Sequence, residues 1–546
     1  MVIIKGDIKK INLSTSRFRQ IIEDGSLYID KTRMIEHFLN ESNSVQLVAR
    51  HRRLGKSLNM DMLRCFLTCK EDLRHLFKGL YIENSPTWEK AHSAPVYYFS
   101  FKELKAESYK KQVLKQVDAH ICDLVDPDSL KGYLYRQYEQ IMHDTNRASE
   151  SIKFLMEMTY KLTGKNSYLL IDEYDNLLMA NYKSAEYAEI RAFETALLSA
   201  AVKDNPYLEK ALLTGVMRIS HESMVSGLNN IVTYDVFGDD LYTDDYGLTD
   251  NEIESLCKLT NVNEDELGQW YNGIRVGAKI IYNIYSVMSY VSRGKFGCYW
   301  GKSGTMDMIV GLLNDKRKDT LVKLLSGEHV KVSMVDRISQ THLSQNTGDQ
   351  SFYSFLVQAG YLALNDSVSS RADTAEVSIP NTELMMVWKN FILENLYINT
   401  PKIRTLFDNV NNLDMFSRDI EYFLNDRLSY HDLAVYQNAN TVAIHERLYH
   451  IFLLGILSAY DDVRCKSPLS NRESGDGQYD ILLERPESNY IFESKTTKNP
   501  KHLKQLSEMA LKQIEDKRYG VEISGDKKLV KIGVAVCGKL CKVVCR

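Results

Sequence analysis

Residues 46–57 read Gln46-Leu-Val-Ala-Arg-His-Arg-Arg-Leu-Gly-Lys-Ser57, and this stretch decides the fold class. A short apolar run before it predicts a strand, and the residues after it, LNMDMLRCFL, predict a helix. A loop between a strand and a helix can hold a phosphate: backbone N–H groups surround it, Lys56 reaches it, and the Ser57 hydroxyl holds Mg²⁺. The first glycine of the usual G-x-x-x-x-G-K-[ST] pattern is replaced by Arg50, so this motif needs a partner elsewhere.

That partner is Ser167-Tyr-Leu-Leu-Ile-Asp-Glu-Tyr-Asp175, an apolar strand that ends in two acids. In this context Asp172 would bind Mg²⁺, directly or through water, and Glu173 would orient and deprotonate the attacking water. A buried strand followed by a charged helix cap is the alternative interpretation. Because both halves are present, the sequence favours a nucleoside triphosphatase.

A third strand, in KALLTGVMRIS, ends near Thr214, where a hydroxyl could sense the γ-phosphate. Arg218 follows it and is assigned either a sensor or arginine-finger role or an ordinary salt bridge. The alternation of apolar strands and periodic helices from about 36 to 235 predicts a parallel sheet.

A second constellation lies near the C-terminus, in GQYDILLERPESNYIFESKTTK. Side chains alternate along a strand, so Glu493 and Lys495 point to one side. Asp480, on the neighbouring strand, can then meet Glu493. Two carboxylates suit Mg²⁺, and a lysine can steer or polarise the attacking water. Charges alternating on an exposed strand are the alternative. The three residues resemble the centre of the PD-(D/E)XK nuclease superfamily.

The nuclease resemblance extends to two flanking helices. Members often carry an acid on the first core helix, which implies Glu446, in HERLYHIFLLGILSAY, as a further metal ligand. Gln513, in ALKQIEDKRYG, matches a polar residue frequent behind the active-site sheet.

The chain as a whole resembles the AAA-ATPase-like bacterial family often fused to a PD-(D/E)XK domain. The motifs that carry this resemblance are IDKTRMIEHFL, ARHRRLGKSLNMDML, LLIDEYDNLL, LLTGVMRISHES with SGLNNI, YGLTDNEI, WYNGIRV, IYNIYSV and SIPNTEL. Members commonly read Arg-Pro-Arg-Arg-Phe-Gly-Lys-Ser at the loop. This chain keeps Arg50, Arg52 and Arg53. The resemblance therefore implies that these arginines and Gly55 help bind the nucleotide, and that the missing first glycine is a family trait.

These motifs divide the chain into three expected domains. The fold class is α/β, with an AAA-like P-loop ATPase domain at 1–245, a mainly helical lid or linking region at 246–404, and a restriction-endonuclease-like α/β domain at 405–546. Packing is favoured over a base or ribose contact for Tyr28–Thr32 near the start of the first domain.

Composition is that of an ordinary globular protein, with 44% hydrophobic and 26% charged residues. The N-terminus lacks a signal-peptide pattern and no apolar run is long enough for a membrane span, so we expect a cytoplasmic protein without a membrane partner. The net charge of −4 means that nucleic acid would be bound by local patches. Cys537, Cys541 and Cys545 are interpreted as structural, since no companion histidine is near.

Two function classes remain open. In the first, ATP with Mg²⁺ (or Mn²⁺ at the nuclease) controls phosphodiester cleavage by the C-terminal site, with nucleic acid as partner, DNA in preference to RNA. In the second, an ATP-driven switch or scaffold carries a nuclease-like domain that only binds nucleic acid. An NTPase acting on proteins would leave Asp480, Glu493 and Lys495 unexplained. A role in defence and assembly into a homo-oligomer are further hypotheses.

Overall fold

The computed structural model describes residues 2–218, 230–238, 241–300, 309, 312–325, 327–335, 348–365, 374–395, 412–427, 453, 469–474, 477–485, 488–520, 527–537 and 540–546. The chain forms two compact units. The first comprises Met1–Trp300 with Lys331–Glu383, and the second comprises Gly301–Val330 with Leu384–Arg546. The chain therefore passes from one unit to the other after Trp300, after Val330 and after Glu383.

The centre of the first unit is a five-stranded parallel sheet in the order β4-β5-β6-β3-β7. Its strands are β3 (Val45–Ala49), β4 (Val96–Ser100), β5 (Ser167–Asp172), β6 (Leu208–Gly215) and β7 (Ile231–Tyr234). All residues of β3 and β5 are buried, as expected of a parallel sheet covered on both faces. This sheet confirms the predicted α/β fold class.

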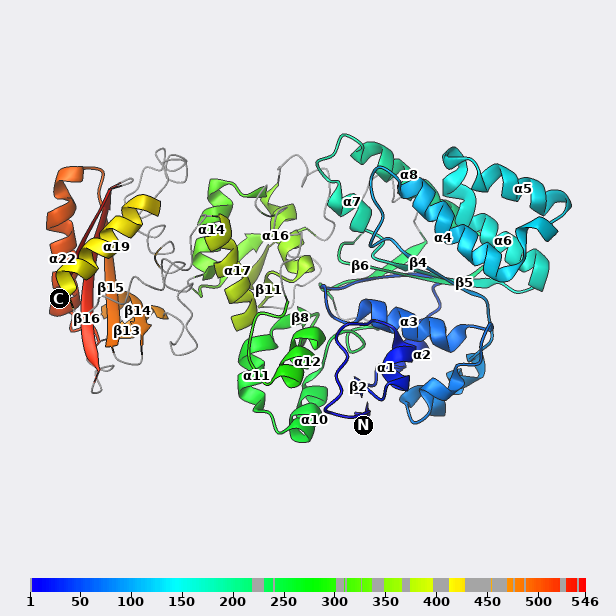
Figure 1. Cartoon of the computed structure of the whole chain (residues 1–546), viewed down its shortest axis with the longest axis horizontal. Coiled ribbons are helices and arrows are strands. Elements are labelled where there is room, and N and C mark those ends of the chain that lie inside the picture. Colours follow the sequence, from blue (N-terminus) through cyan, green and yellow to red (C-terminus); the bar gives the residue numbers. More distant parts are fainter. Residues whose placement is uncertain are drawn as a thin grey trace. The chain divides into compact units, whose positions relative to one another are not determined.

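Helices cover both faces of the sheet (Figure 1). One face carries α4 (Tyr109–Leu124), α5 (Gly132–Met142), α6 (Ser151–Thr163), α7 (Asn176–Ala180) and α8 (Tyr187–Val202), whose apolar side chains join those of β3 to β6 in one core. The other face carries α1 (Phe18–Glu23), α2 (Arg33–Asn40) and α3 (Lys56–Leu67). Short 3₁₀ helices occur at Arg74–Phe77, Tyr81–Asn84, Pro86–Lys90, Pro127–Ser129 and Thr145–Glu150.

The topology of this sheet places a binding site at the carboxyl ends of β3 and β6. From β3 the chain continues to β4 at one edge, whereas from β6 it continues to β7 at the other edge. β3 and β6 are therefore neighbouring strands whose connections lead to opposite edges of the sheet, which makes their carboxyl ends a topological switch point. Open α/β sheets bind their ligands at such a switch point.

The rest of the first unit combines helices with small antiparallel sheets. Its elements are β1 (Ile4–Lys5), β2 (Tyr28–Ile29), α10 (Asp250–Thr260), α11 (Glu264–Tyr271), β8 (Ile274–Val276), β9 (Lys279–Ile281), α12 (Ile284–Arg293), β10 (Val330–Ser333, whose first residue belongs to the second unit), α16 (Asp349–Ala359), β11 (Ala363–Leu364) and β12 (Thr374–Ser378). The region 246–404, expected to be mainly helical, thus also holds the sheets β8-β9 and β10-β12-β11. Strands of two to five residues are too short to show a clear period in sequence.

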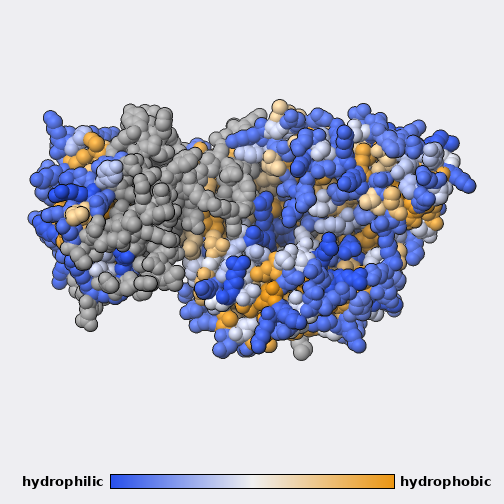
Figure 2. Space-filling view, in the orientation of Figure 1, coloured by the Kyte–Doolittle hydropathy of each residue, from blue (hydrophilic) through white to orange (hydrophobic). Residues whose placement is uncertain are grey.

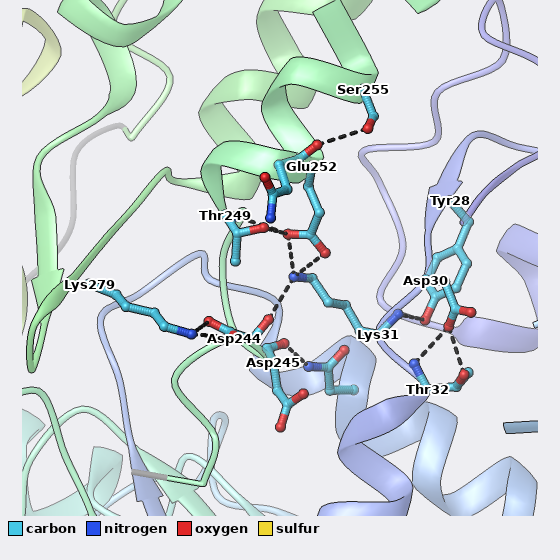
Figure 3. Close-up of polar contacts among 12 residues, drawn as sticks. Tyr28, Asp30, Lys31, Thr32, Asp244, Asp245, Thr249, Glu252, Ser255 and Lys279 are labelled. Carbon is cyan, nitrogen blue, oxygen red and sulfur yellow. Dashed lines mark hydrogen bonds and ion pairs between the residues drawn. The ribbon is translucent and has the colours of Figure 1, made fainter. Parts of the chain in front are cut away.

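Lys31 joins the N-terminal segment to α10 (Figure 3). Its side chain is buried, and its Nζ donates to the Glu252 carboxylate at 2.7 Å and to the Asp244 carbonyl at 2.8 Å. Glu252 also completes a capping box at the start of α10, because it accepts the Thr249 N–H at 2.8 Å. The Tyr28–Thr32 segment therefore makes packing and hydrogen-bonding contacts within the protein.

The second unit is built on a sheet in the order β13-β14-β15-β16-β17, in which only the β15–β16 pair is parallel among the described strands. The strands are β13 (Leu469–Ser474), β14 (Gly477–Glu484), β15 (Ser488–Thr496), β16 (Lys528–Cys537) and β17 (Leu540–Cys545). Its helices are α14 (Asp315–Leu325), α17 (Thr382–Asn395, which begins in the first unit), α19 (Leu413–Arg427) and α22 (Leu503–Asp516), with a 3₁₀ turn at Pro500–His502. Helix α22 lies along β15, β16 and β17 (Figure 1).

The surface is mixed in character. Figure 2 shows hydrophilic side chains over most of the visible coloured surface, with apolar side chains gathered in smaller areas. Among the described residues, no helix is long and apolar enough to cross a membrane. The domain boundaries 1–245, 246–404 and 405–546 stay a prediction.

We expect Glu252→Ala to destabilise the first unit by about 3–5 kcal/mol, because it leaves the Lys31 ammonium buried without its carboxylate. The double variant Lys31→Met, Glu252→Met should lose less stability, since neither charge remains buried. Urea unfolding followed by circular dichroism measures both. If both variants lose the same free energy of unfolding, the unpaired Lys31 charge is not the cause of the destabilisation.

Candidate functional site

The loop after β3 has the geometry of a phosphate-binding loop. β3 ends at Ala49, and the Arg50 N–H continues its pairing with β6 by donating to the Gly215 carbonyl at 3.1 Å. Gly55 then adopts a left-handed conformation, with φ of 89°, directly before α3 begins at Lys56. Glycine reaches this conformation without a steric penalty, so the loop can turn sharply into the helix. The first turn of α3 therefore directs its N–H groups into the loop.

Lys56 lies inside this loop. Its Nζ donates to the Arg50 carbonyl at 2.9 Å and to the His51 carbonyl at 2.7 Å. Burial lowers the pKa of Lys56 to about 8, against the opposing effect of the acidic Asp172, Asp175 and Glu173. The ammonium is thus held by two neutral carbonyls in a partly dehydrated place, where phosphate oxygens would be stronger acceptors.

The Asp172 carboxylate gathers three hydroxyl groups from three different elements. Ser57 of α3 donates to Oδ2 at 2.6 Å, Thr214 of β6 donates to Oδ1 at 2.6 Å, and Tyr98 of β4 donates to Oδ2 at 3.3 Å. The structure therefore brings together Ser57, Asp172 and Thr214, which the sequence places in separate motifs. Tyr98 was not foreseen, because VYYFS offers only the signal of a buried strand.

Glu173 is the residue directly after Asp172 in the chain. Its backbone is left-handed, with φ of 52°, which is uncommon for a residue other than glycine. Burial raises the pKa of Glu173, and the Asp172 charge raises it further. A carboxylate with an increased proton affinity, close to the phosphate loop, is suited to accept a proton from water.

Asp175 fixes the loop that follows β6. Its Oδ2 accepts the Val216 N–H at 2.9 Å and the Met217 N–H at 2.7 Å, and the Tyr174 hydroxyl donates to the Met217 carbonyl at 2.5 Å. No role of Asp175 is predicted from the sequence, although its place in the acidic run DEYD is a usable signal.

Arg218 lies at the end of that loop. Its guanidinium pairs with Asp235 at 3.2 Å, and its N–H donates to Gln358 of α16 at 3.3 Å. The salt bridge, one of its two expected roles, is therefore present. A sensor role for Arg218 remains a prediction.

The three loop arginines lie in different environments. Arg50 is fully buried, and its side chain donates to the Ala49 carbonyl at 3.2 Å. The Arg52 carbonyl accepts the Asn283 amide at 3.4 Å. Arg53 is exposed and turned toward α12: it donates to the Tyr299 carbonyl, and its guanidinium lies 4.2 Å from the centre of the Tyr285 ring.

His51, between these arginines, is also buried. Burial lowers the pKa of His51 to about 3, so its ring is neutral. A Cβ at Gly360, after α16, would lie only 3.0 Å from His51 Cγ. The 349–364 segment is therefore in direct contact with the phosphate loop.

In the second unit, β14 and β15 carry the C-terminal motif. Ile481 pairs with Phe492, so Asp480 and Glu493 occupy the next step of the same register. Asp480 Oδ2 accepts the Ser494 N–H at 2.7 Å and the Ser494 hydroxyl at 2.6 Å. These bonds orient Asp480 at the end of the paired region.

Gln513 joins the other two members of the motif. Its amide N–H donates to Glu493 Oε1, and its carbonyl oxygen accepts the Lys495 Nζ at 2.7 Å. Glu493 and Lys495 therefore face α22 together, as the strand alternation predicts. Glu446 lies outside the described residues, and among the described residues no three His, Cys, Asp or Glu side chains form a metal cluster.

Gly533 sets the distance between α22 and the sheet. It pairs with Glu493 across β15 and β16. A Cβ at Gly533 would lie 2.2 Å from the Ser507 carbonyl oxygen and 2.7 Å from the Leu511 nitrogen, both in the backbone of α22. Only glycine allows so close an approach, which brings Gln513 to Glu493 and Lys495.

Comparison with known proteins finds a match over each of the two regions that carry these motifs. Residues 12–225 match the model of a family described as a predicted AAA-ATPase, and residues 444–545 match the PD-(D/E)XK nuclease superfamily. The chain is thus similar, in this order, to an AAA-ATPase-like domain and to a PD-(D/E)XK nuclease domain. This result confirms the resemblance inferred from the motifs.

A relative in Azotobacter chroococcum mcd 1, described as an uncharacterized protein in the vnfD 5′ region, is 27% identical over 361 residues. The alignment covers 65% of this chain and 64% of the relative. The chain thus matches less than two thirds of that relative's length.

The residues of both sites fit a divalent metal ion with oxygen ligands. Near the phosphate loop, Ser57 Oγ can offer a lone pair to Mg²⁺ while its O–H still donates to the Asp172 carboxylate. In the C-terminal motif, the side chains of Asp480 and Glu493 carry carboxylate oxygens, which are ligands of the kind this ion prefers. Hard oxygen donors suit Mg²⁺ or Mn²⁺ better than softer metals.

We expect Gly533→Ala to destabilise the second unit by about 1–3 kcal/mol, because the added methyl group collides with the backbone of α22. The shift should also weaken the contact of Gln513 with Lys495 and Glu493. Thermal unfolding measures the first effect. An unchanged melting temperature would mean that α22 lies farther from β16 than the structure shows.

Proposed function

We propose that the ATPase-like domain binds and hydrolyses ATP with Mg²⁺, and that this cycle controls cleavage of nucleic acid phosphodiesters by the C-terminal domain. The observation that carries the first half is the convergence of Ser57, Thr214 and Tyr98 on Asp172 beside the phosphate loop. The proposal also includes DNA in preference to RNA as substrate and a cytoplasmic location. A role in defence and assembly into a homo-oligomer are further parts of it.

In the ATP site each residue has one expected role. Lys56 exchanges the Arg50 and His51 carbonyls for phosphate oxygens. Ser57 and Asp172 hold Mg²⁺, which neutralises charge on the phosphates. Thr214, bonded to Asp172, senses the γ-phosphate from the end of β6.

Glu173 would supply the base of this reaction. Its raised pKa means that it takes a proton from the attacking water more readily than an exposed carboxylate would.

In the nuclease site Asp480 and Glu493 would hold a metal ion that activates water. Lys495 would stabilise the charge that builds on the phosphate during attack. Gln513 bonds to both Lys495 and Glu493, which lie on the same face of β15, and so orients their side chains. With Glu446 as a further ligand, the site would have three carboxylates.

One observation favours the second function class, in which this domain only binds nucleic acid. Asp480 already accepts two hydrogen bonds on one oxygen from Ser494. A metal ion would have to share this carboxylate with them. Cleavage assays on Asp480 variants distinguish the two classes.

We expect Lys56→Ala to abolish ATP binding, because the phosphates lose their cation. Glu173→Gln should retain ATP binding but slow hydrolysis by about 10²–10⁴-fold, since only the base is removed. Calorimetry measures binding and phosphate release measures turnover. Lys111→Ala, at an exposed position on α4, is the matched control and should behave as the parent. Parental turnover by both site variants would contradict the ATPase proposal.

For cleavage, we expect Asp480→Ala to eliminate activity because the metal ion loses a ligand. Lys495→Ala should keep metal binding and lose rate, since lysine is no ligand. The exposed Asp516→Ala and Lys512→Ala on α22 are controls of the same residue types. Plasmid, linear DNA and RNA are incubated with Mg²⁺ or Mn²⁺, with and without ATP. If Asp480→Ala cuts as well as the parent, the C-terminal domain is not the nuclease and the binding class is favoured.

A further inference from the structure

Two of the places where the chain leaves the first unit are hydrogen-bonded to each other. Glu383 Oε1 accepts the Tyr299 N–H and the Trp300 N–H, each at 2.6 Å, and the Cys298 thiol lies 3.8 Å from the Glu383 carbonyl oxygen. The chain enters the second unit directly after Trp300 and again directly after Glu383. We call Tyr299, Trp300 and Glu383 the crossing cluster.

The phosphate loop reaches this cluster through one side chain. The Arg53 guanidinium donates to the Tyr299 carbonyl and stacks on the Tyr285 ring at 4.2 Å. Its charge also acts on Glu383, whose carboxylate is buried. Tyr299 is thus held on both sides: its carbonyl by Arg53 of the loop, its N–H by Glu383.

Arg53 is placed so that a phosphate can compete for it. It lies two residues before Gly55 in the phosphate loop, and its backbone is left-handed with φ of 65°. Such backbone strain persists only where the surrounding contacts enforce it. Its side chain is exposed and is held by a neutral carbonyl and a ring, both weaker partners for a guanidinium than a phosphate.

We propose that Arg53 exchanges the Tyr299 carbonyl for a phosphate of ATP, and thereby transmits nucleotide occupancy to the crossing cluster. This inference rests on the proposed function and specifies how ATP would control cleavage. When Arg53 leaves, the Tyr299 carbonyl loses its donor and the buried Glu383 loses a nearby positive charge. The two connections that begin at Trp300 and Glu383 are then held less firmly.

The differential contact that such a switch needs is present in the structure. A ligand shifts a conformational equilibrium only through contacts that differ between the two states. Here the nucleotide-free state has the Arg53–Tyr299 and Arg53–Tyr285 contacts. The nucleotide-bound state would replace both with a charge-assisted bond to phosphate. The contacts of Lys56 and Asp172 can form in either state of Arg53.

The first test measures amide hydrogen exchange with and without a non-hydrolysable ATP analogue and Mg²⁺. In the parent, the Tyr299 and Trp300 amides should exchange several-fold faster when the analogue is bound. In Lys56→Ala, which binds no nucleotide, exchange should not change. If calorimetry shows the analogue bound to the parent and the exchange of these amides is unaltered, the inference is wrong and the ATPase proposal stands. If the parent binds no analogue, both are wrong.

The second test uses Tyr285, whose ring Arg53 stacks on and which has no role in the ATP or nuclease sites. Tyr285→Leu removes the ring, so Arg53 is held less firmly at Tyr299. Without nucleotide, its Tyr299 and Trp300 amides should exchange at close to the rate of the nucleotide-bound parent. Tyr285→Phe keeps the ring and should match the parent.

The rate of nucleic acid cleavage is the functional measurement for Tyr285→Leu and Tyr285→Phe. ATP turnover should be unchanged in both variants. The ratio of cleavage rates with and without ATP should approach one in Tyr285→Leu and keep the parental value in Tyr285→Phe. A parental ratio in Tyr285→Leu would overturn the inference alone. A parent that neither hydrolyses ATP nor cuts would overturn the proposed function instead.

Discussion

The buried carboxylate of Asp172 is the constraint on which the first unit's site depends. A carboxylate that is 3% exposed needs hydrogen-bond partners to offset the loss of water. Its partners come from α3, β4 and β6, so the relative positions of these elements are tied to one group. The register of β5 with β4 places Ser100 beside Asp172, which puts Tyr98 within reach. The same contacts that satisfy Asp172 in the protein also gather the oxygen atoms that a metal ion requires.

The phosphate loop is in turn supported by the part of the first unit that follows the sheet. The Gly247 N–H donates to the Leu54 carbonyl at 3.0 Å, and Asn59 of α3 donates to the Asp245 carbonyl at 2.8 Å. This region is anchored to the N-terminal segment by the buried pair of Lys31 and Glu252. Nucleotide-induced movement of the loop would therefore act on the segment that leads into α10, as well as on the sheet, which the loop contacts through Arg50 and Ser57.

The sequence predicted the parts of the site that depend on local order. Lys56, Ser57 and Asp172 each follow directly from a strand end or helix start, and parallel strands bring such ends to one edge of a sheet. Arg53 could not be placed in this way: the resemblance implied a nucleotide contact, but its partner Tyr299 lies 246 positions away. Glu383 lies in the motif SIPNTEL, but no role could be assigned to it, since a single acid at a helix start is common. Its role depends on where the chain passes between units, which only the fold defines.

In the second unit, the neutral amide of Gln513 is the hydrogen-bond partner of two side chains of opposite charge. Glu493 and Lys495 lie on the same face and need partners of opposite character. An amide offers a donor to the carboxylate and an acceptor to the ammonium at once, whereas a glutamate there would repel Glu493 and a lysine would repel Lys495. The side chains of Glu493 and Lys495 thus both bond to α22. The close approach of α22 to the sheet depends in turn on Gly533. A displacement of α22 would therefore act on the side chains of Glu493 and Lys495 together through Gln513, whereas the Asp480 carboxylate bonds to Ser494 of β15.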